Sequence, residues 1–208
     1  MIDSNVLLAF FSTSLILALS PGPDNLFVLA QSAQNGRKAG IYVTLGLATG
    51  LFGHTAAVAF GLSALLRSSS LAFGTLKFIG AAYLVYLAWQ ALKATAITHQ
   101  QTPVQALSNG RLYLRGIVMN LTNPKVSFFF MAFLPQFADP HRGSMILQFF
   151  QLGGVFLTAT LLVFGLISYF AGSLGERFRN SVLAQKALNR IAAVVFVSLA
   201  VKLAVSER

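Results

Sequence analysis

Two short segments of the chain combine helix-breaking prolines with ionisable side chains. Residues 20–25 read Ser-Pro-Gly-Pro-Asp-Asn and include Asp24, and residues 123–125 read Asn-Pro-Lys and include Lys125. A carboxylate and an ammonium group at such positions suit a zwitterionic ligand, whose ammonium would face Asp24 and whose carboxylate would face Lys125 and a helix N-terminus. The alternative is a permanent ion pair between Asp24 and Lys125 that only holds the protein together.

The prolines indicate that each segment interrupts a helix. Proline lacks a backbone donor and clashes with the carbonyl four residues earlier, so Leu17, Leu19 and Asn120 should each keep a free carbonyl oxygen. Asn123 is able to cap the helix that follows the second break. In lipid, free carbonyls are tolerated only where protein groups or water satisfy them. We therefore expect two broken helices beside a polar cavity, as in secondary transporters.

The composition is that of a membrane protein. Of the 208 residues, 56% are hydrophobic and only 10% are charged, whereas soluble domains carry about 25% charged residues. This length allows roughly six spans of about 20 residues with short connections. The 15 basic and five acidic residues give a net charge of +10, which in a membrane protein first sets orientation. The basic residues are too scattered for nucleic-acid binding, and the lack of cysteine excludes disulfides and thiolate metal sites.

Hydrophobic runs predict an all-α integral membrane protein whose helices cross the bilayer six times. The expected spans are residues 6–33, 40–66, 73–94, 112–137, 145–172 and 187–205. The second and fourth loops hold few basic residues, whereas the first, third and fifth carry Arg37, Lys38, Lys93, Arg111, Arg115, Arg177, Arg179, Lys186 and Arg190. The positive-inside rule therefore predicts that these three loops are cytoplasmic and that both termini are periplasmic.

The two ionisable groups at the prolines are expected at a similar depth. Asp24 lies 13 residues before Arg37, and Lys125 lies ten residues after Arg115. At a helical rise of about 1.5 Å per residue, each is about 15 to 20 Å from the cytoplasmic face, close to the bilayer midplane. Ionisable groups are costly in lipid, so both are candidates for a functional role.

A faint internal repeat divides the chain into halves. Three short matches relate them, namely Pro23-Asp24 with Pro124-Lys125, Phe60-Gly61-Leu62 with Phe164-Gly165-Leu166, and Leu87-Ala88 with Leu199-Ala200. We interpret residues 1–95 and 111–208 as two repeats joined by a polar linker at 96–110, within a single transporter domain. Because each half would hold three spans, an odd number, the halves must be inverted relative to each other, as in many secondary transporters.

Glycines in the second expected span recur at helical spacing. Gly46, Gly50 and Gly53 are three or four residues apart, which puts them on one face of a helix. Small residues on one face let another helix backbone approach closely in a membrane. We therefore expect this face to pack against a neighbouring span.

His54 is the only histidine inside an expected span. Imidazole exchanges protons near neutral pH, which suits coupling of transport to a proton gradient. The alternative is a structural histidine that is hydrogen-bonded to a neighbouring helix.

The sequence contains no serine-nucleophile motif, no Walker loop and no histidine–carboxylate metal cluster. It therefore predicts no enzyme, and active transport would use an ion or substrate gradient.

Several motifs together resemble the LysE/RhtB family of bacterial amino-acid exporters. The segment at residues 20–25 is followed by Lys77-Phe78-Ile79-Gly80-Ala81-Ala82-Tyr83-Leu84, Asn123-Pro124-Lys125 and Phe133-Leu134-Pro135-Gln136-Phe137. The resemblance covers essentially the whole chain, and the ordered set is more specific than any single motif. It implies efflux of amino acids or their derivatives across the bacterial inner membrane by proton antiport. The Pro-Gly-Pro-Asp form resembles the branch that exports threonine, homoserine and other neutral amino acids such as leucine.

Carrying the family pattern onto this chain gives the expected substrate-binding residues Pro21, Gly22, Pro23, Asp24, Asn25, Asn123, Pro124 and Lys125. The candidates for proton coupling are Asp24 and His54. We expect an amino acid, protons and the lipid bilayer as partners, a homodimer as a further candidate assembly, and no nucleic acid, cofactor or metal. Two other functions stay open: export of an inorganic cation, as in cadmium-type relatives, and a structural membrane subunit that moves no solute. A single buried carboxylate and the lack of cysteine disfavour the cation exporter.

Overall fold

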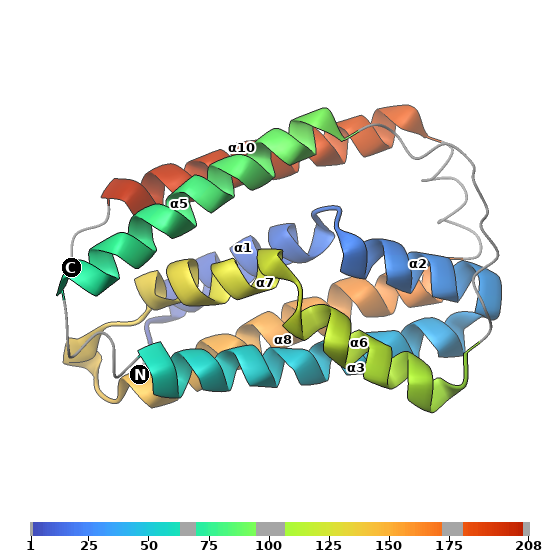
Figure 1. The fold of residues 1–208 in the computed structure, drawn as a ribbon, viewed down its shortest axis with the longest axis horizontal. Helices are drawn as coiled ribbons and strands as arrows, with labels where there is room; N and C mark the ends of the chain where they lie inside the picture. Colours follow the sequence, from blue (N-terminus) through green and yellow to red (C-terminus); the bar gives the residue numbers. More distant parts are fainter. Residues whose placement is uncertain (1, 63–69, 95–106, 172–180, 206–208) are drawn as a thin grey trace.

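The structure, a computed structural model, describes residues 2–62, 70–94, 107–171 and 181–205, and every regular element in these ranges is a helix (Figure 1). The α-helices are α1 (Ser4–Leu19), α2 (Pro23–Asn35), α3 (Arg37–Ala56), α5 (Ser70–Lys93), α6 (Asn109–Leu121), α7 (Pro124–Phe128), α8 (Met145–Phe170) and α10 (Val182–Val205). Short π-helical or 3-10 segments are η1 (Ala57–Leu62), η2 (Phe129–Phe133), η3 (Leu134–Phe137) and η4 (Pro140–Arg142). The predicted all-α class is therefore confirmed for these ranges.

Both helix breaks that the prolines predict are present. α1 and α2 meet at a bend of 62°, and α6 is bent by 49° relative to the helical run from Pro124 to Phe137. Each second helix starts with proline, since Pro23 begins α2 and Pro124 begins α7. Proline is well suited to this position because the donor it lacks would have no partner within the helix anyway. The first and fourth predicted spans are therefore broken helices.

Helix length and hydropathy identify membrane-spanning elements in the described part of the chain. Three helices qualify alone, Arg37–Gly61, Met145–Phe170 and Val182–Val205, and counting each bent pair as one span raises the number to five. α5 has 24 residues and coincides with the third predicted span, but it is not among these five. The chain is therefore a multi-pass membrane protein.

Some helices extend beyond the predicted hydrophobic spans. α3 begins at Arg37 rather than at residue 40, and α10 begins at Val182 rather than at residue 187. A helix continues easily past the hydrocarbon layer because long basic side chains at its end reach the headgroups. Hydropathy therefore marks the lipid-embedded part of each helix and not its ends.

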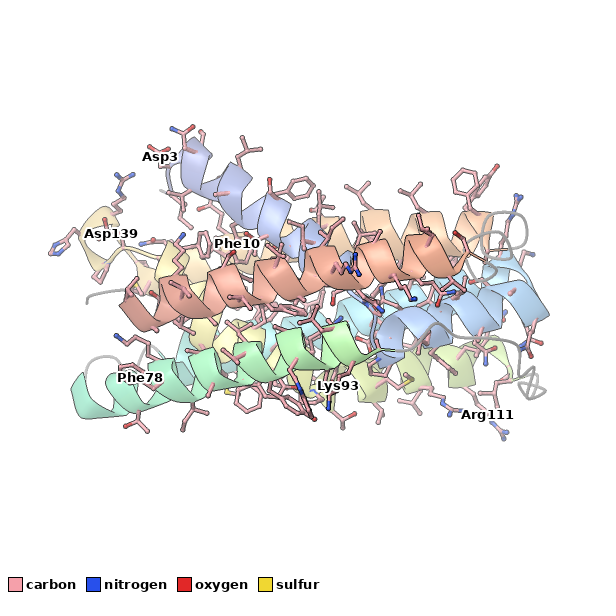
Figure 2. All side chains as sticks on the ribbon, turned by 90° about the horizontal axis from the view of Figure 1, so that it is seen from above. Asp3, Phe10, Phe78, Lys93, Arg111 and Asp139 are labelled. Atoms are coloured by element: carbon pink, nitrogen blue, oxygen red, sulfur yellow. The ribbon has the colours of Figure 1, made fainter. Side chains whose placement is uncertain are left out.

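The described helices run between the two ends of one bundle. α1 begins and α10 ends at the same end (Figure 1). Asp3 and Asp139 also lie at this end, and Arg111 lies at the opposite one (Figure 2). The predicted linker falls mostly within residues 95–106, which lie outside the described ranges, as do Arg67, His99, Arg177 and Arg179.

Glycines bring α3 and α6 into backbone contact. A Cβ atom built on Gly46 would lie 2.1 Å from the backbone oxygen of Tyr113, and one on Gly116 would lie 2.5 Å from a backbone oxygen of α3. Gly50 and Gly53 face α6 as well. The predicted glycine packing face of the second span is therefore confirmed. α3 also packs against α8, and α5 packs against α10.

An aromatic cluster fills the bundle between the helix breaks and the end where α1 begins. The ring of Phe129 lies 5.0 Å from that of Phe133 and 5.3 Å from that of Phe156, and Phe10 lies 5.0 Å from Phe137, measured between centroids. All five side chains are buried. Three of them belong to η2 and η3, where the backbone departs from α-helical geometry. Tightly packed aromatic rings therefore fill this half of the core.

Replacing Gly46 by alanine tests the contact between α3 and α6. The added methyl group would overlap the Tyr113 backbone oxygen, which moves only if α6 moves, and overpacking of this kind costs about 1–3 kcal/mol. We expect Gly46→Ala to lower the Tm of the detergent-purified protein, measured by thermal unfolding. Gly154→Ala is the matched control, because a Cβ built there meets no neighbouring helix within 4 Å. Equal Tm values for the two variants would contradict the contact.

Candidate functional site

The first break presents backbone groups in the middle of the bundle. α1 ends where the Ser20 amide donates to the Ile16 carbonyl at 2.9 Å, and α2 starts after Gly22. The side chain of Asn25 turns back across the break, and its Nδ2 donates to the Ala18 carbonyl at 2.6 Å. One of the carbonyls that the end of a helix leaves unpaired is thus satisfied by a side chain.

Lys125 reaches from the second break to the first. Its buried ammonium group donates to the carbonyls of Ser20 at 3.0 Å and Leu17 at 3.3 Å. The Leu17 oxygen is one of those that the proline rule predicts to be free. Gly22 leaves room for this approach, because a Cβ atom there would lie only 3.1 Å from Lys125 Nζ. Lys125 therefore joins the two breaks through backbone carbonyls.

The second break is stabilised from α3 and by its own cap. Pro124 deprives the Asn120 carbonyl of its helical donor, and this oxygen lies 3.0 Å from His54 Nε2 and accepts the Asn123 amide at 3.0 Å. A carbonyl oxygen only accepts, so His54 carries a hydrogen on Nε2. Asn123 Oδ1 accepts from the Lys125 amide at 3.0 Å, which confirms the predicted cap. His54 is thus hydrogen-bonded to a neighbouring helix, one of its two predicted roles.

Asp24 lies where the two breaks meet. It occupies the first turn of α2 and is only 2% exposed. The side-chain amides of Asn123 and Asn120 lie beside its carboxyl group, and the charge of Lys125 is close enough to act on it. Asp24 Oδ1 accepts no hydrogen bond of normal geometry from either amide, and it has no other partner. A buried carboxyl is therefore surrounded by donors without being fully satisfied by them.

Asp24 and Lys125 do not form a direct ion pair. Among the residues that the structure describes, both ion pairs within 4.0 Å are made by Arg142, with Asp3 at 3.8 Å and with Asp139 at 3.4 Å. The permanent pair that the sequence left as an alternative is therefore not formed in this structure.

Several polar atoms at the breaks are buried without a hydrogen-bond partner. They are Asp24 Oδ1, Asn25 Oδ1, Asn120 Oδ1 and Asn123 Nδ2, and Gln31 Nε2 is a further one about two turns along α2. An unpaired buried polar group costs about 1–3 kcal/mol. In native proteins such groups mark a functional role or a bound water or ion. The arrangement is therefore suited to a polar ligand.

The eight predicted substrate-binding residues all lie at the two breaks, so the structure brings the two motifs together. The side chain of Asn120 was missed, because only its carbonyl was considered. The available signal was its position four residues before Pro124, in the last turn of α6. No set of three His, Cys, Asp or Glu side chains within the described ranges is arranged to hold a metal ion.

Comparison with known proteins identifies the family. The family model described as LysE type translocator matches residues 15–207, nearly the whole chain. The chain belongs to the LysE type translocator family. The resemblance to the LysE/RhtB family that the ordered motifs indicate is thereby confirmed.

Relatives of this LysE type translocator include a named exporter. A homoserine/homoserine lactone efflux protein of Salmonella typhimurium is 37% identical over 155 residues, which cover 74% of this chain and 75% of the relative. An uncharacterized membrane protein of Vibrio cholerae is 32% identical over 205 residues, or 99% of each chain. No solved structure matches the chain significantly. The chain is therefore a membrane efflux transporter and not an enzyme, as the sequence predicts.

Removing the Lys125 ammonium tests whether it braces the two breaks of this translocator. Methionine keeps an unbranched apolar stem but leaves the Leu17 and Ser20 carbonyls buried without this donor. Hydrogen bonds to charged groups contribute about 1.5–3 kcal/mol, so we expect Lys125→Met to lower the Tm of the purified protein. Lys186→Met, at an exposed position of α10, should leave it unchanged. A wild-type Tm in Lys125→Met would contradict the bracing role.

Proposed function

We propose that this transporter exports small, mainly neutral amino acids, with homoserine as the first to test, in exchange for protons. The observation that carries the proposal is the buried Asp24 carboxyl between two helix breaks, which has no ion-pair partner within 4.0 Å in the described part of the chain. An ionisable group inside a membrane bundle suits binding of a cation or a proton. The relative named as a homoserine/homoserine lactone efflux protein supports this substrate class.

We further propose that the chain crosses the membrane six times, as two inverted repeats. The order of elements supports this, because a broken span (α1 and α2), α3 and α5 are followed by a second broken span (α6 and α7), α8 and α10. Helices at equivalent places in the two halves pack in pairs, α3 with α8 and α5 with α10. Three spans per half give the halves opposite orientations, with the site at their interface.

The basic end of the bundle faces the cytoplasm in this proposal, and both termini are periplasmic in the inner membrane. Arg111 lies at the end opposite to Asp3 and Asp139 (Figure 2). Arg37 and Lys38 begin the helix that follows the first broken span. Cytoplasmic ends of membrane helices carry an excess of basic residues, which supports this orientation.

The proposed export cycle exposes the site to one side of the membrane at a time. Export requires the substrate to reach Asp24 from the cytoplasm, past the apolar cluster that includes Val28, Leu47 and Phe164, while the aromatic cluster around Phe129 closes the path to the periplasmic end. The Asp24 carboxyl releases its proton to the cytoplasm and binds the substrate ammonium in its place. The substrate carboxylate faces the third N–H of Lys125, whose other two N–H groups donate to backbone carbonyls. After outward opening, a periplasmic proton displaces the ammonium, so Asp24 carries either substrate or proton and couples the two fluxes.

Proteoliposome transport tests the role of Asp24. Asp24→Asn keeps the size of the side chain but removes its charge and its exchangeable proton, so we expect it to abolish homoserine flux driven by a pH gradient. Asp139→Asn, which alters an exposed carboxyl at the end of the bundle, should keep wild-type flux. Both variants should insert in wild-type amounts. Gradient-driven homoserine flux through Asp24→Asn would overturn the assignment, and a wild-type protein that moves no solute would favour a structural subunit.

His54 is assigned the structural role of donating to the Asn120 carbonyl. Glutamine offers an N–H donor but does not exchange protons near neutral pH. We therefore expect His54→Gln to retain gradient-driven homoserine flux, whereas His54→Leu should lower the Tm because the carbonyl loses a partner. If His54→Gln still exchanges homoserine but no longer responds to the pH gradient, His54 is the coupling group instead.

A further inference from the structure

The side-chain amide of Asn120 is part of the site, although neither proline motif includes it. Asn120 is 2% exposed, and its Oδ1 has no hydrogen-bond partner. The amide lies beside the Asp24 carboxyl, which belongs to the other break. Buried acceptors in native proteins normally accept a hydrogen bond, so a donor is missing beside this oxygen.

The position of Asn120 is fixed by contacts that leave its side-chain oxygen unpaired. Its backbone carbonyl is held by His54 and by the Asn123 amide. A Cβ atom built on Gly50 would lie 2.7 Å from Asn120 Oδ1, so the Asn120 amide packs directly against the backbone of α3 at Gly50. Amides inside an α-helix already donate to carbonyls one turn earlier. α3 therefore positions Asn120 without supplying the missing donor.

Most unpaired atoms at the breaks are oxygens. Asp24 Oδ1, Asn25 Oδ1 and Asn120 Oδ1 lack donors, whereas Asn123 Nδ2 is the one unpaired nitrogen in these two segments. Lys125 has at most one N–H group left for these three oxygens, because the other two donate to backbone carbonyls. A ligand that fits must bring several donors on one atom, as a primary ammonium group does.

We propose that Asn120 is a substrate-binding residue that accepts an N–H of the substrate's primary ammonium group at Oδ1, beside Asp24. This inference rests on the proposed function and adds a rule of specificity. Charge alone would let Asp24 bind any cationic amine. Two acceptors on different helices instead require at least two N–H donors, so the transporter distinguishes a primary amine from an N,N-dimethylated amine of equal charge.

Transport kinetics of two Asn120 variants test the proposal. Losing a hydrogen bond to a charged group lowers affinity by about tenfold or more, so Asn120→Leu should raise the KM for homoserine by about that factor with little change in kcat. Asn120→Asp keeps an acceptor oxygen but replaces the N–H donors by a second carboxyl oxygen beside Asp24, so its KM should rise less than that of Asn120→Leu. Asn189→Leu is the matched control, because Asn189 on α10 is also a buried asparagine with an unpaired Oδ1.

Competition by N,N-dimethylhomoserine supplies a second readout. It should inhibit wild-type homoserine flux at least about tenfold more weakly than unlabelled homoserine does, and this difference should shrink in Asn120→Leu. Equal inhibition by the two amines in the wild type, or equal rises in KM for Asn120→Leu and Asn120→Asp, would overturn the inference while leaving the proposed function intact. A wild-type protein that moves no homoserine would overturn both.

Discussion

Backbone carbonyls at the two helix breaks need donors in a place remote from water, and much of the structure follows from how they obtain them. The Lys125 ammonium serves the carbonyls of Leu17 and Ser20, and His54 serves the carbonyl of Asn120. Each of these donors comes from a different helix than the carbonyl it satisfies. Within a membrane this is what permits a broken helix, so the two breaks are held by contacts between distant parts of the chain.

The same requirement decides where side chains are small and where the core is polar. Gly22 leaves space for Lys125 Nζ, and Gly50 leaves space for the Asn120 amide. The aromatic cluster fills the half of the bundle toward the start of α1, and a second buried apolar cluster, which includes Val28, Leu47 and Phe164, lies in the other half. The polar site therefore lies between two apolar clusters.

The sequence predicts most of the fold and part of the site, because the decisive signals there are local. Hydrophobic runs located the helices, the prolines located both breaks, and Asn123 was identified as a cap from its place before a proline. The partners of Lys125 were not predicted, since the direction of the carbonyls depends on the 62° bend between α1 and α2. The unpaired oxygen of Asn120 and the π-helical geometry of η2 also depend on packing between distant helices, which no local pattern records.

A crystal structure of the protein with homoserine bound would test most directly whether the two breaks form one binding site. We expect the homoserine nitrogen within hydrogen-bond distance of both Asp24 and Asn120, with Lys125 still donating to the Leu17 and Ser20 carbonyls. Homoserine bound away from the breaks, with Asp24 in direct contact with Lys125, would contradict a shared site and would make the two charged residues a structural pair.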